Sequence, residues 1–308
     1  MIVSVKPVTL YIQILLSISL LISASNTLAE IKSPANEVSF SVLKTAESSG
    51  SLEAMAVDGG SWFTIRNLVH VAVLIRHPKG DFLWDSGIGK EVDLQMEVFN
   101  FFESQLFSIN NVKPARQQLN AESYDIQNLM AIIPSHLHWD HASGLEDFSG
   151  VPIWVQKESY AEAQTGQVPA FVISQYDSPD LKWKTFELND QPYQGFSKSF
   201  DIYGDGSAVL VDLSGHTLGH LGLFLTLGSG KQYLFTGDTT WTIKGVEENK
   251  SRPWITEKLV GVDTDFEENA QVVDKLHRLS KERPELMIVP AHDELQLKRL
   301  PLFPKFSF

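Results

Sequence analysis

Residues 130–141 read MAIIPSHLHWDH and hold a dense group of side chains that can bind metal ions. The apolar run Met130–Ile133 predicts a short buried strand. Directly after this strand come three histidines and one aspartate, namely His136, His138, Asp140 and His141. So many polar ligands in one short stretch are costly to bury unless a metal ion binds them. The stretch therefore predicts a metal site at the end of a strand.

The spacing of these four ligands predicts two ions. In an extended segment His136 and His138 share a side, whereas Asp140 and His141 can turn toward a neighbouring ion. Imidazole and carboxylate ligands suit Zn²⁺ and also hold Fe, Mn, Co or Ni. The chain has no cysteine, so thiolate ligands are excluded. The ligand types leave the element open.

Three further ligand candidates come from other parts of the chain. His216 lies in SGHTLGH, Asp238 in TGDT and His292 in PAHD. Each follows an apolar run that predicts a strand and sits beside a glycine or a proline. We therefore expect all seven side chains to meet where strands end.

Apolar runs between turn residues predict the strands. Two pairs of runs flank the turns His-Pro-Lys-Gly and Gly-Ser-Gly and predict hairpins. The polar stretch 44–51 is predicted to be a loop. The predicted strands are Leu68–Arg76, Asp81–Trp84, Met130–Ile133, Ile153–Gln156, Ala208–Asp212, Leu221–Leu227, Gln232–Phe235 and Leu286–Val289.

The clearest predicted helix follows a capping box formed by Thr264 and Glu267 and ends before Pro284. Strands and helices interleave, with hairpins as well as crossovers. This pattern favours an α/β (α+β) fold with a mixed sheet over a purely parallel, doubly wound fold. No repeat or long linker divides residues 30–308, so they are predicted to form one domain.

Residues 1–29 have the pattern of a signal peptide. Lys6 precedes the apolar run Val8–Ile22, and a stretch of small residues predicts cleavage after Ala29. Polar residues interrupt the run, which is shorter than the roughly 20 residues that a spanning helix needs. We therefore expect a periplasmic or secreted protein with no stable membrane anchor after cleavage.

Composition narrows the class of partner. The chain of 308 residues is 43% hydrophobic and 20% charged, which is typical of a globular protein. Its formal net charge of −13 disfavours partners with a phosphate backbone. We expect a small-molecule substrate and no nucleic acid.

The ligand candidates together resemble the metallo-β-lactamase superfamily, whose pattern is H-x-H-x-D-H followed by a His, an Asp and a His at later strand ends. All seven positions match, and the resemblance covers nearly all of residues 60–300. It implies a four-layer αββα sandwich with mixed sheets and two divalent ions, most simply zinc. The implied ligands are His136, His138 and His216 for the first ion, Asp140, His141 and His292 for the second, and Asp238 as the bridge between them.

The resemblance also implies how the site works. Two dications lower the pKa of a bridging water toward neutrality and polarise the carbonyl or phosphoryl oxygen of the substrate. Asp140 and Asp238 are the catalytic candidates, with Asp140 carrying a proton to the leaving group. Asp85, in Leu-Trp-Asp-Ser-Gly, matches an aspartate behind the ligands, and His220 is a further candidate for the outer shell. The histidines predicted to be structural or solvated are His70, His77 and His277.

Within the superfamily, the motifs are most similar to those of the N-acyl homoserine lactone hydrolases, which share a late Gly-Asp and a terminal His-Asp-x-x-Gln, here residues 292–296. Those enzymes commonly place a tyrosine three residues after the bridging aspartate. This chain has Trp241, which offers one N–H donor and no acceptor. The resemblance implies an exported dinuclear zinc hydrolase of lactones or related esters, with Trp241 as a candidate determinant of specificity.

Three alternatives come from other branches. Secreted organophosphate hydrolases share the ligand set, so a phosphotriester or aryl ester is the second substrate class. A β-lactamase is disfavoured, because zinc β-lactamases usually have a cysteine in place of Asp238 or lack the carboxylate bridge. A non-hydrolytic iron protein acting on oxygen or sulfur compounds is disfavoured, because the flavin-linked diiron branch typically has glutamate in place of His138.

An aromatic segment, residues 91–107, stands apart from these motifs. One interpretation is that it covers the metals and receives an acyl chain. The other is a packed helix or a homodimer contact.

Overall fold

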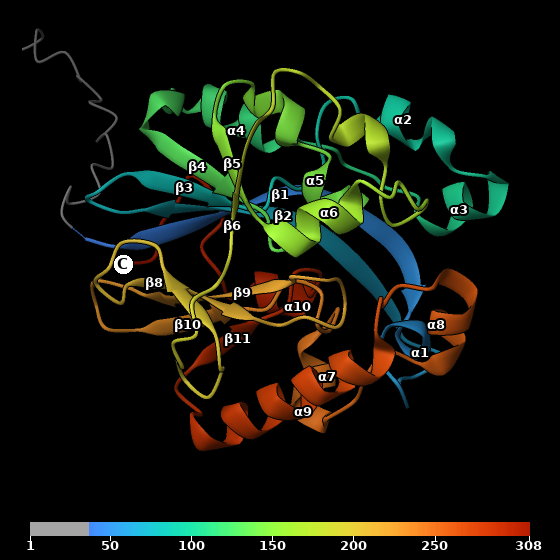
Figure 1. The fold of residues 1–308 in the computed structure, drawn as a ribbon. Helices are drawn as coiled ribbons and strands as arrows, with labels where there is room; N and C mark the ends of the chain where they lie inside the picture. The colour runs from blue at the N-terminus through green and yellow to red at the C-terminus, as the bar shows by residue number, and fades with distance from the viewer. Residues whose placement is uncertain (1–36) are drawn as a thin grey trace, which may run out of the picture. The chain divides into compact units, whose positions relative to one another are not determined.

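The computed structural model describes residues 37–308, so the predicted signal peptide lies outside the described residues. Within the described part, two sheets face each other and helices cover their outer faces (Figure 1). One sheet has six strands in the order β1-β2-β3-β4-β5-β6, and the other has five in the order β11-β10-β9-β8-β7. The predicted αββα sandwich is confirmed. Among residues 37–308, no helix is long and apolar enough to cross a membrane.

Both sheets are mixed. The first consists of β1 (Ser39–Leu52), β2 (Ile65–Arg76), β3 (Asp81–Trp84), β4 (Leu129–Ile133), β5 (Pro152–Gln156) and β6 (Lys182–Phe186). Strands β1 to β3 pair antiparallel, and β3 to β6 pair in parallel. The second consists of β7 (Ser199–Asp201), β8 (Ala208–Asp212), β9 (Leu221–Thr226), β10 (Gln232–Phe235) and β11 (Met287–Val289). Its β10–β11 pair is parallel and its other pairs are antiparallel.

Helices pack on both outer faces. On the side of the first sheet lie α2 (Val92–Gln95), α3 (Phe101–Leu106), α4 (Ala115–Ala121), α5 (Trp139–Ala142) and α6 (Lys157–Ala163). On the side of the second lie α7 (Ile243–Glu248), α8 (Trp254–Val260) and α9 (Phe266–Glu282). The remaining helices are α1 (Glu53–Ala56) and α10 (Glu294–Leu297), with short 3-10 turns at Met96–Val98, Ile126–Asn128, Leu145–Phe148 and Ile173–Gln175.

Alternation along the strands explains how the layers are held together. On β2, Val73 and Ile75 point into the core between the sheets, whereas Ala72 and Leu74 point into the core beneath α4 and α6. A third core joins the second sheet to α7 and α9, with Leu276 fully buried. Each buried aliphatic side chain of this size contributes about 1.5–3 kcal/mol. The layers thus leave one end of the sandwich, where the strands end, free to carry polar groups.

The stretch 44–51, predicted to be a loop, instead belongs to β1. Its backbone pairs with β2, for example where Ser48 lies opposite Leu68. Its polar side chains find partners inside the protein, since Thr45 Oγ1 donates to the backbone oxygen of His70 at 2.9 Å. Backbone pairing therefore outweighs the polar composition.

The cap of α9 is one residue later than predicted. The side chain of Asp265 accepts the backbone N–H of Glu268 at 2.9 Å. Thr264, the predicted cap, donates its hydroxyl to Glu162 at 2.6 Å. The helix ends at Glu282, before Pro284 as expected.

Candidate metal centre and substrate cavity

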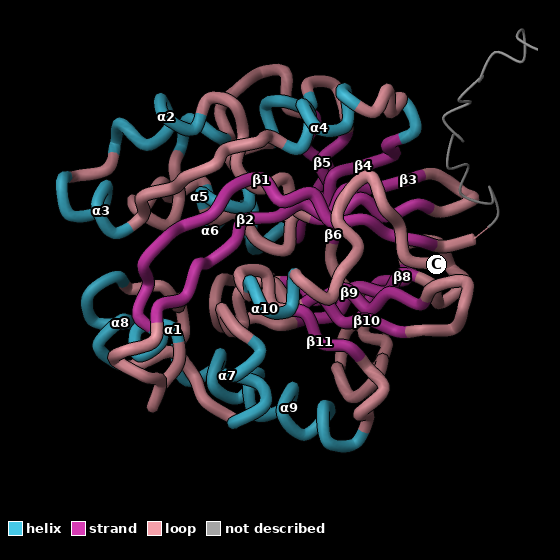
Figure 2. The backbone as a smooth tube through the Cα atoms, turned by 180° about the vertical axis from the view of Figure 1, so that it is seen from behind, coloured by secondary structure: helices cyan, strands magenta, loops and turns pink. Residues whose placement is uncertain are grey.

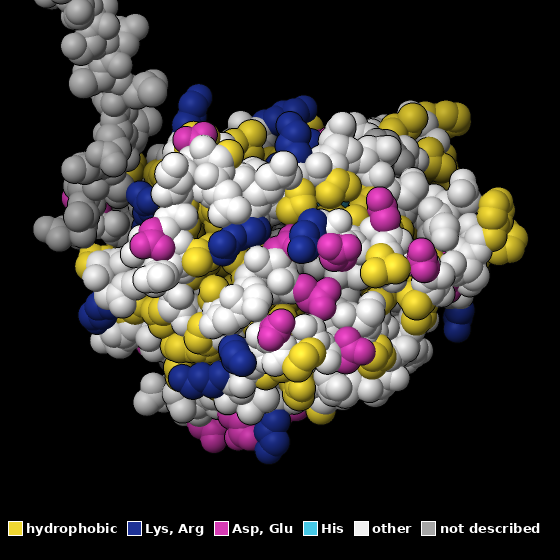
Figure 3. Space-filling view, turned by 90° about the horizontal axis from the view of Figure 1, so that it is seen from above, with side chains coloured by type: hydrophobic (Ala, Val, Ile, Leu, Met, Phe, Trp, Pro, Cys, Tyr) yellow, Lys and Arg dark blue, Asp and Glu magenta, His cyan; other side chains and the backbone are white. Residues whose placement is uncertain are grey.

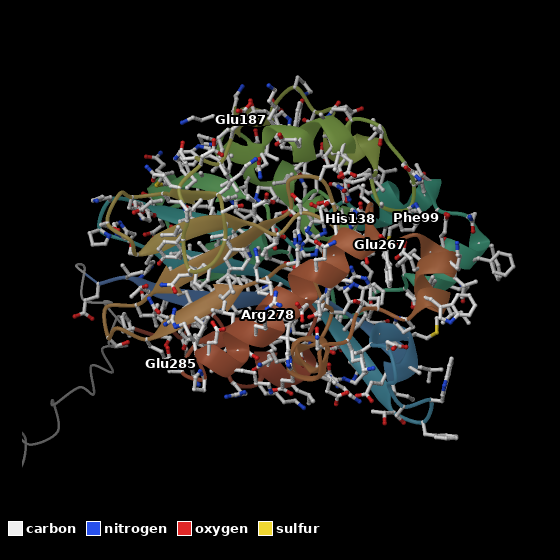
Figure 4. All side chains as sticks on the ribbon, turned by 60° about the horizontal axis from the view of Figure 1, so that its bottom comes forward. Phe99, His138, Glu187, Glu267, Arg278 and Glu285 are labelled. Carbon is white, nitrogen blue, oxygen red and sulfur yellow. The ribbon has the colours of Figure 1, made fainter. Side chains whose placement is uncertain are left out.

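The seven predicted ligands meet at one end of the sandwich. His136 and His138 follow β4, and the other five come from α5 or from the ends of β8, β10 and β11. All seven side chains are buried. Figure 4 shows His138 in the interior, far from the surface residues Arg278 and Glu285.

Three of these histidines lie close together. His136, His138 and His216 offer nitrogen atoms that all lie within 4.8 Å of one another. The Nε2 atoms of His136 and His216 are 3.2 Å apart. Burial, together with the neighbouring histidines, lowers the pKa of His136 and of His138 well below the ordinary value. His136 and His138 are therefore unprotonated at neutral pH, which is the state that binds metal ions.

Asp238 connects this group to a second one that contains carboxylates. Its Oδ2 lies 3.0 Å from His292 Nε2 and 3.8 Å from His216 Nε2. Its Oδ1 lies 3.1 Å from His141 Nε2. Both atoms of this last pair are buried and have no hydrogen-bond partner in the described structure. Orphaned buried atoms of this kind fit a metal ion that supplies the missing contact.

In three of the ligand histidines, the ring nitrogen that faces away from the centre, Nδ1, contacts a hydrogen-bond acceptor. This arrangement leaves Nε2 of each ring directed at the centre and sets the tautomer that a metal requires. The pairs are His141 Nδ1 with Asp85 Oδ2 at 3.0 Å, His216 Nδ1 with Asp263 Oδ1 at 2.8 Å, and His292 Nδ1 with the backbone oxygen of Val69 at 2.7 Å. Asp85 thus lies behind the ligands, where the sequence predicts it.

His220 supports the backbone of Asp238. Its Nδ1 donates to the Leu213 oxygen at 3.1 Å, and its Nε2 accepts the Asp238 N–H at 3.3 Å. Burial lowers the pKa of His220 to about 3, so its Nε2 can accept. Gly237 has a φ of 49°, and a Cβ atom there would lie 2.4 Å from His220 Nε2. The glycine therefore allows the histidine to approach.

Two residues behind His216 have no counterpart among the sequence predictions. Asp263 accepts from His216, and the buried Arg252 forms an ion pair with Asp263. Arg252 also donates to the Asp238 backbone oxygen at 2.7 Å, and its guanidinium lies 5.5 Å from the centre of the Trp241 ring. Burial raises the pKa of Asp263, but Arg252 outweighs it and holds that pKa at about 2. Neither residue directly follows an apolar run that predicts a strand, so the pattern that identified the ligands did not identify them.

His70, predicted to be structural or solvated, lies beside the candidate ligands. Its Nδ1 lies 3.1 Å from Asp140 Oδ2, and its ring lies 5.1 Å from that of His292. His70 is on the part of β2 that reaches the centre, a position that the alternating pattern of this strand could have indicated. His77, which stacks on Tyr203, and His277 lie elsewhere, as predicted.

A cavity of about 320 Å³ opens onto the centre. His138, Asp140, Asp238 and His292 form its floor. Its walls are mostly apolar and come from the ends of β1 and β2 and from α1, α8 and the segment after α3, which cluster at one end of the described fold (Figures 1 and 2). The wall residues used below are Leu52, Met55, Phe107, Trp241 and Leu259.

The aromatic segment 91–107 divides between wall and surface. Leu106 and Phe107 line the cavity, and Phe99 packs against Trp139 with 5.7 Å between ring centres. Phe101 and Phe102 are exposed, at 74% and 81%. The view from above shows hydrophobic side chains gathered at this edge (Figure 3). Only the end of the segment therefore lies where the first interpretation requires it.

Residues 65–292 match the family model described as the metallo-beta-lactamase superfamily. Because the match spans most of the chain and includes all seven candidate ligands, the protein belongs to the metallo-β-lactamase superfamily. This fold explains the two facing mixed sheets and the ligands at their strand ends.

The relatives that the chain resembles are lactonases. N-acyl homoserine lactonase AttM of Rhizobium radiobacter is 27% identical over 225 residues, covering 71% of this chain and 80% of that protein. N-acyl homoserine lactonase AiiA of Bacillus thuringiensis subsp. kurstaki is 26% identical over 247 residues, covering 78% and 87%. A solved N-acyl homoserine lactone hydrolase with N-hexanoyl-L-homoserine bound at its catalytic metal centre gives a TM-score of 0.66 at 21% identity, covering 88% and 99%. These relatives and neighbours are metal-dependent hydrolases, as the sequence predicts for this chain.

Proposed function

We propose that the protein is a dinuclear zinc hydrolase that opens lactones with an apolar substituent, among them N-acyl homoserine lactones. The observation that carries the proposal is the cavity, in which a floor of metal-ligand side chains meets apolar walls. Such a cavity accommodates a polar reacting group at the floor and an acyl chain along the walls. Each buried methylene contributes about 0.8 kcal/mol, so affinity should rise with chain length until the walls are covered.

The proposed ligand sets are those that the family resemblance implies. Bound divalent ions supply a hydroxide nucleophile at neutral pH and polarise the carbonyl oxygen. His136, His138 and His216 would hold the first ion, Asp140, His141 and His292 would hold the second, and Asp238 would serve both. Asp140, which lies on the floor of the cavity, would accept the proton of the attacking hydroxide and pass it to the ring oxygen as the C–O bond of the lactone breaks. The apolar walls exclude bulk water from this step.

Similarity to AttM and AiiA supports a lactone substrate, and so does the terminal His-Asp-x-x-Gln motif. Asp293 of this motif has a structural task, because it caps α10 by accepting the backbone N–H of Leu295 and of Gln296. It also receives an ion-pair contact from the buried Arg66 at 3.2 Å. The motif thus fixes the chain directly after His292.

Trp241 favours aryl esters or phosphotriesters as the second candidate. Its indole lines the cavity and lies over Arg252. A flat ring of this size can stack on an aromatic leaving group. It cannot donate and accept through one hydroxyl as a tyrosine does.

Metal content and substrate turnover test the proposal together. The chain from residue 30 onward would be purified, its metals measured by elemental analysis, and hydrolysis followed for acyl homoserine lactones of increasing chain length, an aryl ester, a phosphotriester and a β-lactam. Two zinc ions per chain and turnover that rises with acyl length are expected. Turnover of only the aryl ester or phosphotriester would favour the second candidate, and a single iron without hydrolysis would contradict both.

We also propose that the protein is exported and that residues 1–29 are removed. The support is the run Val8–Ile22 with the small residues before Glu30. Cell fractionation and N-terminal sequencing of the mature chain test this. A cytoplasmic protein that keeps Met1 would contradict it.

A further inference from the structure

A buried histidine that is absent from the superfamily's ligand pattern contacts one of the candidate ligands. His70 is 4% exposed and lines the cavity from the middle of β2. Its Nδ1 lies 3.1 Å from Asp140 Oδ2, and its Nε2 lies 2.9 Å from Ser48 Oγ on the paired strand β1. Ser48, His70 and Asp140 therefore form a continuous chain of contacts from the cavity wall to its floor.

The direction of these hydrogen bonds follows from the chemistry of the three groups. A neutral imidazole carries one N–H, either on Nδ1 or on Nε2. The Asp140 carboxylate only accepts, which places the proton on Nδ1. Nε2 is then an acceptor, and the Ser48 hydroxyl rotates to donate to it. Every contact in the chain is satisfied in this arrangement.

The oxygen that His70 holds is the one that faces the centre. Asp140 Oδ2 lies 3.4 Å from His292 Nε2 and 3.9 Å from His141 Nε2. A carboxylate oxygen has two lone pairs, so it can accept from His70 and still bind an ion. Hydrogen bonds to a ligating carboxylate keep it oriented, and their loss typically costs 10–100-fold in metal affinity or activity.

We propose that His70 is a positioning residue that turns Asp140 toward the second metal ion through its Nδ1–H, with Ser48 fixing the tautomer. The alternative is that His70 is itself a ligand, since His70, Asp140 and His292 offer ligand atoms within 4.8 Å of one another. A directly ligating Nδ1 carries no proton, so the hydrogen bond to Asp140 would be lost. The two roles therefore differ in which substitute side chain can replace the imidazole.

Substitution of His70 by asparagine and by leucine separates the two roles. Asparagine places an amide N–H near the position of Nδ1 and is a poor zinc ligand, whereas leucine offers neither a donor nor a ligand. The affinity of each zinc ion would be measured by competition with a chromophoric chelator, and the fold checked by circular dichroism. His70→Leu is expected to lower the affinity for one of the two zinc ions by about 10–100-fold. The affinities of His70→Asn should stay within a few-fold of the wild type.

Two further variants complete the design. Ser48→Ala removes the hydroxyl that fixes the tautomer of His70. It should lower the affinity for the same zinc ion less than His70→Leu does. His77→Asn removes a histidine outside the site and should leave both affinities unchanged. The proposal is overturned if His70→Asn loses as much zinc affinity as His70→Leu, or if His70→Leu keeps both ions at wild-type affinity. If His70→Leu does not fold, the comparison of His70→Asn with Ser48→Ala decides: loss of the ion in His70→Asn contradicts the proposal.

The kinetic consequence rests on the proposed function. Because Asp140 delivers the proton while the walls bind the substrate, His70→Leu should lower kcat by about 10–100-fold with little change in KM. Absence of hydrolysis with every substrate would contradict the proposed function only. The chelator competition would still decide the role of His70.

Discussion

The floor of the cavity and its walls are built differently. The floor side chains lie on α5 or just after β4, β10 and β11, and the distal nitrogen of His292 is held by the backbone oxygen of Val69. The walls come largely from short helices; α3 buries none of its residues and α8 buries only Thr256. Elements with so few buried contacts open and shift at low cost in free energy. The comparison assigns the chemistry to rigid groups and the choice of substrate to adaptable ones.

The largest effect is expected on the floor. Asp238→Ala removes the carboxylate that contacts both ligand groups, so both ions should be lost and kcat/KM should fall by on the order of 10³-fold. The fold should survive, because the cores lie elsewhere. Elemental analysis, kinetics and circular dichroism check this, with His277→Ala as the control. A metal-free Asp238→Ala protein with wild-type turnover would remove the basis for a two-metal site.

The second largest effect is expected at Arg252, which lies behind the candidate ligands. Arg252→Leu leaves the buried Asp263 without its cation, and breaking a buried pair in this way costs about 3–5 kcal/mol of unfolding free energy. Chemical denaturation measures this loss, and Arg252→Lys should recover part of it. Equal stability of the leucine variant and the wild type would show that the pair contributes nothing.

The same substitution should change the response to acid. Asp263 has a folded pKa of about 2 against an ordinary 3.8, so its contribution is fully present above the ordinary value and is lost as the pH falls toward 2. Without Arg252 the folded pKa should rise, so the metal-free variant should lose this contribution at a higher pH. Unfolding curves of metal-free protein between these values test the sign.

A wall residue should give a smaller effect that depends on substrate. Phe107→Ala removes apolar surface from the cavity, so kcat/KM for a long-chain lactone should fall about 10-fold, equivalent to about 1.4 kcal/mol. A short-chain lactone should be affected less, and zinc content not at all. Equal losses for both chain lengths would indicate that Phe107 does not contact the acyl chain.

The smallest change is expected at Trp241. Trp241→Tyr restores the residue that lactonases commonly have, and should shift preference toward lactones and away from aryl esters by a few-fold. Metal content should stay the same, because Trp241 holds no ligand and contacts the guanidinium of Arg252 through its ring. The ratio of the two kcat/KM values measures the shift. A loss of zinc would show that Trp241 supports the floor instead.

The same contrast explains what could be predicted from the sequence. The floor was predictable, since clustered histidines and aspartates after apolar runs have few uses other than metal binding. The walls were not, because contacts far apart in the chain assemble them; Thr256 Oγ1, for example, donates to the backbone oxygen of Met55 at 2.7 Å. For His70 the sequence offered only a weak signal, its place in the alternating pattern of β2, because a single histidine is not a motif.

Strand pairing also explains why part of the cavity wall could not be predicted from the sequence. The stretch 44–51 is polar and reads as a loop, yet β1 pairs with β2 from Ser39 opposite Arg76 to Leu52 opposite Ile65, with a register shift after Lys44 and another after Ser48. Whether a polar segment forms a strand depends on the partner strand that tertiary structure brings to it. The sequence of the segment itself does not contain that information.

The extended β1–β2 hairpin limits which side of the cavity wall can move. One end of the hairpin is anchored in the central core by Phe40 and Ile75, and the other end carries Ser48 and Leu52 into the cavity wall. A wall that continues two paired strands cannot swing as a hinged lid without breaking their ladder. Substrate admission and product release should therefore depend on movement of α3 and α8, which bury few residues, and not on movement of the hairpin. Their rates should respond to substitutions in Leu259 and Leu106 while the hairpin keeps its protection against hydrogen exchange.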